Sequence, residues 1–106
     1  MNLIKQNEIM QDINEKLIFR IVSKKTGIKE HVIKSNIRIS SVKIARQLVH
    51  YYVHKCTGHV TRTAHLTFNN HATVYNSNKR VLDWGNYPDY KENIEKIEPL
   101  LKKFKL

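Results

Sequence analysis

The 106-residue sequence has few of the residues that break or crosslink a chain, with three Gly, two Pro and one Cys. Because Cys56 is the only cysteine, no disulfide can form within the chain and packing must stabilise the fold. Few helix breakers and almost no strand pattern predict an all-α protein. The length suits one small domain over residues 1–106 and argues against a multidomain enzyme.

Long hydrophobic runs are missing as well. The apolar runs span only a few residues, and the first residues lack the apolar centre of a secretory signal. The sequence therefore predicts neither a membrane span nor a membrane partner. We expect a cytoplasmic protein associated with the nucleoid, in the host cytoplasm if a phage encodes it.

Acidic residues are almost missing from the middle of the chain. Between residues 20 and 81, Glu30 is the only carboxylate, whereas twelve Lys and Arg residues and all six His lie there. This segment therefore carries a net charge of +11, and the nearly neutral ends bring the charge of the whole chain to +10. Such an excess is typical of proteins that bind a polyanion, since solubility alone favours mixed signs. It also argues against a nuclease, which needs carboxylates to hold Mg²⁺.

A cluster of His50, His54, Cys56 and His59 has a spacing compatible with a metal ion. However, Cys56 falls on an apolar helical stripe, and His50 and His54 fall on a basic one, so packing and phosphate contacts explain them better. A thiol on a packing stripe is also a poor nucleophile. No Gly-x-x-x-x-Gly-Lys-Ser/Thr loop is present either. We predict no enzyme, no cofactor and no metal.

Hydrophobic periodicity predicts a bundle of about six helices, with a core over residues 8–84 and a packing helix in residues 85–106. The helices are expected at about residues 8–26, 30–35, 41–57, 61–67, 71–83 and 88–104. Gly27 is placed to close the first helix, Ser40 or Ser41 to cap the third, and the third helix is expected to stop before Gly58. We expect Pro99 to kink or restart the last helix.

The predicted third helix carries two stripes with the same period. One stripe is apolar and consists of Ala45, Leu48, Val49, Tyr52 and Cys56. The other is basic or hydrogen-bonding and consists of Lys43, Arg46, Gln47, His50 and His54. We therefore expect one face of this helix to pack in the core and the other to face a ligand.

A short turn at Asn69-Asn70 joins the two helices that follow. Two helices connected in this way form a helix-turn-helix, expected at about residues 61–83, whose second helix presents its first residues to the DNA major groove.

Three segments resemble the C-terminal DNA-binding domain of the bacterial replication initiator DnaA, a helical domain of the Trp-repressor-like helix-turn-helix class. The resemblance covers about residues 8–104 and implies the family's DNA-binding domain without its ATPase module. The segments are Val22-Ser23-Lys24-Lys25-Thr26-Gly27-Ile28, then Arg38 with Ala45-Arg46-Gln47-Leu48, and Asn70-His71-Ala72-Thr73-Val74, which is similar to the family's Asp-His-Thr-Thr-Val.

The resemblance implies a role for each matching position. Arg38 matches an arginine that enters the minor groove, where an enhanced negative potential favours guanidinium. The residues expected to read base edges in the major groove are Asn69, Asn70, His71 and Ala72. The residues expected to contact phosphates are Lys43, Arg46, Gln47, His54, Thr73 and Arg80. Asn69 and Asn70 replace the family's Arg and Asp, so the base read there need not be the same.

These observations predict sequence-specific binding of double-stranded DNA in control of replication or transcription, without ATPase activity. Two alternatives stay open: a protein-interaction module that mimics or modulates a replication initiator, and a non-specific nucleic-acid binder. Two protein partners stay open, a second copy of this chain in a homodimer or a replication initiator. In either case the amphipathic first helix is the expected docking surface.

Overall fold

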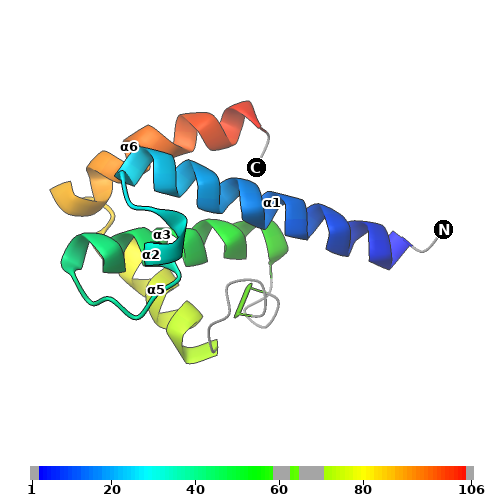
Figure 1. The fold of residues 1–106 in the computed structure, drawn as a ribbon, viewed down its shortest axis with the longest axis horizontal. Coiled ribbons are helices and arrows are strands. Elements are labelled where there is room, and N and C mark those ends of the chain that lie inside the picture. Colours follow the sequence, from blue (N-terminus) through cyan, green and yellow to red (C-terminus); the bar gives the residue numbers. More distant parts are fainter. Residues whose placement is uncertain (1–2, 59–62, 65–70, 105–106) are drawn as a thin grey trace.

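The computed structural model describes residues 3–58, 63–64 and 71–104. Figure 1 shows a bundle of helices, and no strand occurs among these residues, which confirms the all-α prediction. Where about six helices were predicted, five are described, and most of the predicted 61–67 helix lies outside the described residues. The five are α1 (Leu3–Thr26), α2 (Glu30–Ile33), α3 (Ser40–Thr57), α5 (His71–Trp84) and α6 (Pro88–Lys103).

Helix α3 lies at the centre of the bundle. It packs mainly against α1 and α5, and α6 covers α1 from the side away from α5 (Figure 1). The predicted apolar stripe is confirmed, since Ala45, Leu48, Val49 and Tyr52 are buried and Cys56 is partly buried. The core therefore forms around α3, and apolar residues of α1 and α6 complete it.

The second predicted stripe of α3 does not stay at the surface along its whole length. Lys43 is exposed, and Arg46 and Gln47 are partly exposed. His50 is only 1% exposed, so its expected place on a basic outer face is wrong. The reason is that α5 packs against this side of α3, which the period of a single helix cannot reveal.

Two glycines end long helices as the sequence predicted. Gly27 and Gly58 adopt the left-handed conformation, with φ of 75° and 72°, which suits a residue without Cβ. Their amides donate to the carbonyls of Ser23 and His54, at 2.9 and 2.8 Å. Helices α1 and α3 therefore end where glycine makes a left-handed turn favourable.

The predicted helix starts are less accurate. Helix α1 begins at Leu3 rather than at residue 8, because the intervening residues include no Gly or Pro to stop it. The N-cap of α3 is Ile39, which makes no side-chain capping bond, rather than Ser40 or Ser41. Sequence alone located these helices but not their first residues.

Pro99 lies inside α6, which continues to Lys103 without restarting. The proline removes the hydrogen bond that would reach Glu95, but both residues are exposed, so water can bind the freed carbonyl. Ile97 and Leu101 on either side are buried in the core and hold the helix together. Among the described residues, none of the helices has the length and hydropathy needed to span a bilayer.

Candidate functional site

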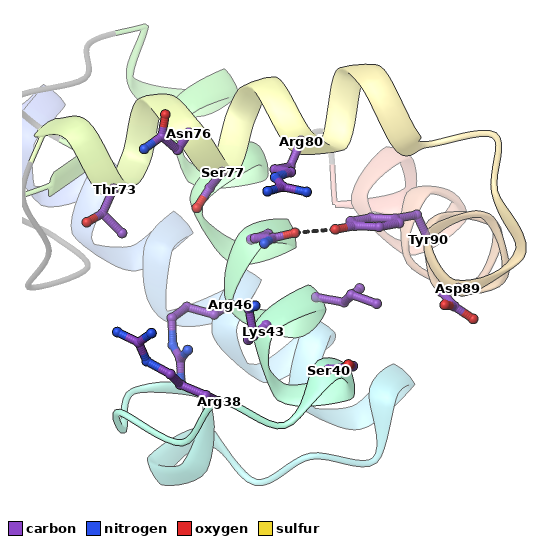
Figure 2. A pocket seen from close by; sticks show the side chains of 12 residues that line it. Arg38, Ser40, Lys43, Arg46, Thr73, Asn76, Ser77, Arg80, Asp89 and Tyr90 are labelled. Carbon is purple, nitrogen blue, oxygen red and sulfur yellow. Dashed lines mark hydrogen bonds between the residues drawn. The ribbon is translucent and has the colours of Figure 1, made fainter.

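A groove of about 560 Å³ opens between the link before α3, the start of α3 and one side of α5 (Figure 2). Asp89 and Tyr90 at the start of α6 close one end. Four cationic side chains line the groove, and Asp89 is the only carboxylate among the described lining residues. The cations are Arg38, Lys43, Arg46 and Arg80. A groove with this balance attracts an anion.

The groove brings together most of the residues predicted to contact the minor groove and phosphates. These are Arg38, Lys43, Arg46, Gln47, Thr73 and Arg80, from three separate segments of the chain. His54 is not among the lining residues, although it is partly exposed on α3.

Helix α5 contributes one face to the groove. Thr73, Asn76, Ser77 and Arg80 line the groove and recur at the spacing that places side chains on one side of a helix. Figure 2 shows Thr73, Ser77 and Arg80 along the groove side of α5. Sequence analysis missed Asn76 and Ser77. Their separations of three and four residues from Thr73 were a signal that could have identified them.

Arg46 uses its guanidinium to hold the link in place. Its Nε donates to the carbonyl of Ile33 at 2.8 Å, and its Nη2 donates to those of Ser35 at 2.5 Å and Ile37 at 3.2 Å. Burial lowers the pKa of Arg46, yet an arginine remains protonated in proteins. Its observed contacts are therefore structural, and the phosphate contact stays a prediction.

The link itself is also hydrogen-bonded. The Ser35 hydroxyl donates to the Val32 carbonyl at 2.5 Å, and it accepts from the Ile37 amide at 3.2 Å. These bonds and the Arg46 contacts fix the backbone from which Arg38 extends. Arg38 is exposed and lies on the link side of the groove, opposite Arg80 on α5 (Figure 2). It is therefore presented from an ordered support.

Gln47 lies at the end of the groove near α6. Its Oε1 accepts a hydrogen bond of 2.5 Å from the Tyr90 hydroxyl, which joins α3 to α6 (Figure 2). Burial raises the pKa of Tyr90, so the hydroxyl remains a donor at neutral pH. With its oxygen engaged, Gln47 keeps its amide hydrogens as donors for a ligand.

His50 and Ser77 join α3 to α5 beside the groove. His50 Nδ1 lies 2.7 Å from Ser77 Oγ, and both residues are buried. Burial, with a smaller contribution from the Arg46 charge, lowers the pKa of His50 to about 4, so the ring is neutral at neutral pH. His50 therefore supplies no positive charge to an anion at that pH.

Of the four residues predicted to read bases, two fall at the start of α5. His71 and Ala72 are its first two residues, and Asn69 and Asn70 lie outside the described residues. The first helix expected for a helix-turn-helix falls mostly outside them too, although Thr63 and Ala64 are helical and buried. The major-groove contacts thus stay a prediction.

In the part of the chain that the structure describes, no group of three or more His, Cys, Asp and Glu side chains is arranged to hold a metal ion. Burial raises the pKa of the Cys56 thiol, which disfavours the reactive thiolate. The groove is therefore the site that the described residues define best.

The sequence matches no protein-family model, and comparisons with curated proteins and with solved structures found no match either.

Proposed function

We propose that this protein binds double-stranded DNA along the groove between α3 and α5, and that it does so to control replication or transcription. The observation that carries this proposal is the gathering of Arg38, Lys43, Arg46 and Arg80 around one groove lined by a single described carboxylate. In the proposed complex α5 is the second helix of a DnaA-like helix-turn-helix and enters the major groove, while Arg38 enters an adjacent minor groove.

The chemistry of the groove suits a sugar-phosphate backbone. Lys43 and Arg80 supply charge, and the Gln47 amide and the hydroxyls of Thr73 and Ser77 supply neutral polar groups. Most protein–DNA hydrogen bonds involve such groups and phosphate or sugar oxygens, which position the protein on the duplex. The residues at the start of α5 are then left to read bases.

The same composition supports binding rather than cleavage. Hydrolysis of a phosphodiester with metal assistance needs several carboxylates around the scissile phosphate, and the described groove lining offers Asp89 alone. We therefore propose a protein that occupies DNA and acts without ATPase or nuclease activity.

Selection from a random duplex library at physiological salt, followed by anisotropy titrations of an enriched duplex, tests the proposal. If about six phosphates are contacted, affinity should fall roughly 10³-fold between 50 and 200 mM salt. An enriched motif with that slope is the expected result. Binding without enrichment would leave a non-specific nucleic-acid binder, and salt-insensitive or absent duplex binding would overturn the proposal.

A second candidate, a module that binds a replication initiator or another protein, is favoured by a different side of α5. Tyr75 and Leu82 are 62% and 70% exposed and lie opposite the groove-lining face of the helix. Large apolar side chains that remain exposed are suited to protein contacts. Loss of partner binding in Leu82→Ser, with DNA affinity intact, would support this candidate.

A further inference from the structure

The His50–Ser77 pair has a chemical feature that the proposed DNA contacts do not use. Ser77 lines the groove and is 5% exposed, whereas His50 is 1% exposed behind it. The 2.7 Å contact joins His50 Nδ1 to Ser77 Oγ, and either atom can be the donor, depending on the tautomer of the ring. The direction of this bond decides where the Ser77 hydrogen points.

The other nitrogen of His50 helps to choose between the tautomers. Nε2 is shielded from solvent and has no hydrogen-bond partner among the described residues. The neutral ring carries one hydrogen, so a hydrogen on Nε2 would be a buried donor without an acceptor. A hydrogen on Nδ1 is used in the bond to Ser77, and Nε2 then keeps only a lone pair. Buried N–H groups without acceptors are rare, so the Nδ1–H tautomer is favoured.

With Nδ1–H as the donor, the Ser77 oxygen accepts and its own hydrogen is free to point elsewhere. We propose that Ser77 forms a subsite for one phosphate oxygen in the groove, with His50 as the positioning residue that turns the Ser77 hydroxyl hydrogen toward the ligand. Arg80 lies one turn further along the same side of α5 and supplies the charge that a phosphate needs (Figure 2). The inference rests on the proposed function at one point only, namely that the phosphate belongs to a DNA backbone.

The same tautomer argues against a serine nucleophile. A serine is activated when a neighbouring base accepts its hydrogen, but His50 Nδ1 already carries one in this arrangement. The pair therefore aligns a donor, and no covalent step is proposed.

The tautomer can be measured directly in the wild-type protein. Long-range ¹⁵N–¹H spectra of uniformly labelled protein at pH 7 distinguish Nδ1–H from Nε2–H, and the signal missing in His50→Gln assigns the ring. We expect Nδ1–H in the free protein and after addition of inorganic phosphate or duplex DNA. The Nε2–H tautomer would overturn the proposal, because Ser77 would then donate to His50.

Binding measurements test the subsite itself. Ser77→Ala should lower affinity for inorganic phosphate and for duplex DNA by about 10-fold, as expected for a hydrogen bond to a charged group, while Ser77→Thr should retain it. The matched control is Ser41→Ala, an exposed α3 serine that does not line the groove. An unchanged affinity in Ser77→Ala would overturn the subsite and indicate that the hydroxyl bonds back to its own helix.

His50→Phe removes the positioning group. If circular dichroism shows that this variant folds, it should lose about the same factor as Ser77→Ala, and the double variant should lose no more. Additive losses would contradict a shared role. If His50→Phe does not fold, the wild-type tautomer and Ser77→Ala still decide the proposal.

The two ligands separate failure of the subsite from failure of DNA binding. Phosphate binding that depends on Ser77, without duplex binding, would support the subsite and overturn the proposed function. Duplex binding that is unchanged in Ser77→Ala would support the proposed function and overturn the subsite.

Discussion

The side of α3 that faces α1 and the side that borders the groove use different chemistry. On the first, Ile18, Val22, Leu48 and Ile97 are almost completely buried in a continuous apolar core. On the second, the contacts are polar, with Arg46 bonded to three carbonyls and His50 to Ser77. Apolar burial stabilises without direction, whereas hydrogen bonds fix geometry. Core residues therefore contribute stability alone, whereas the polar residues contribute stability and also fix the shape of the groove.

Loss of a core side chain should lower stability without changing the groove. Ile97→Ala removes a fully buried side chain from the core and should reduce the free energy of unfolding by about 2 to 5 kcal/mol. Urea denaturation measures this loss. Because Ile97 does not line the groove, DNA affinity of the folded fraction should stay unchanged, and a large decrease would show that the two sides are coupled.

Protonation of His50 on the polar side of α3 should lower the stability of the protein at acidic pH. The unfolded residue has a pKa near 6.5 and takes up a proton there, whereas the folded residue does so only near pH 4. The unfolded state therefore binds more protons in this window, and stability should fall by about 3 kcal/mol as pH falls from 7 to 4. Urea denaturation at several pH values measures the slope.

The control for this pH effect is His50→Gln, which has no imidazole to titrate. Between pH 6.5 and 5, where carboxylates remain ionised, its stability should change much less than that of the wild type. Equal slopes in the two proteins would show that His50 is not the group responsible.

Arg46→Lys should reveal how far the groove depends on one side chain. Lysine keeps the charge but lacks the planar fork that reaches three carbonyls, so stability should fall by about 1 to 3 kcal/mol. DNA affinity should fall as well, because the link that presents Arg38 loses its support. Stability and anisotropy at matched salt measure the two effects, and a fully active, fully stable variant would contradict this role.

Arg80→Ala should have the smallest effect of these variants, and this effect should fall on ligand binding. We expect about a 10-fold loss of duplex affinity and a salt slope reduced by about 1, with stability nearly unchanged. Arg20→Ala on α1 is the matched control, since Arg20 is exposed and does not line the groove. Similar losses in both variants would mean that the charge acts diffusely rather than at the groove.

Sequence reasoning succeeded where the deciding interactions were local. Gly27 and Gly58 ended helices as expected, and the apolar stripe of α3 was found because its period is a property of one helix. The cations that line the groove were named from the resemblance and the charge pattern, before their arrangement in space was known. Local rules therefore identified most of the helices and much of the groove lining.

Sequence reasoning failed at the contacts between helices. His50 was assigned to an outer face because the packing of α5 on α3 leaves no trace in the period of α3. The contacts of Arg46 with the link also depend on a backbone path that no single residue specifies. Such tertiary contacts decide whether a polar side chain forms hydrogen bonds within the protein or stays available to a ligand.

The start of α3 adds something to the groove that no side chain provides. Its N-cap, Ile39, makes no capping bond through its side chain, and Ser40 in the first turn lines the groove. The amides of an uncapped first turn keep their capacity to donate, and the helix dipole places roughly half a positive charge there. Part of the attraction for anions therefore belongs to the backbone. Replacing every cation of the groove by a neutral residue should leave a weak residual affinity for anions.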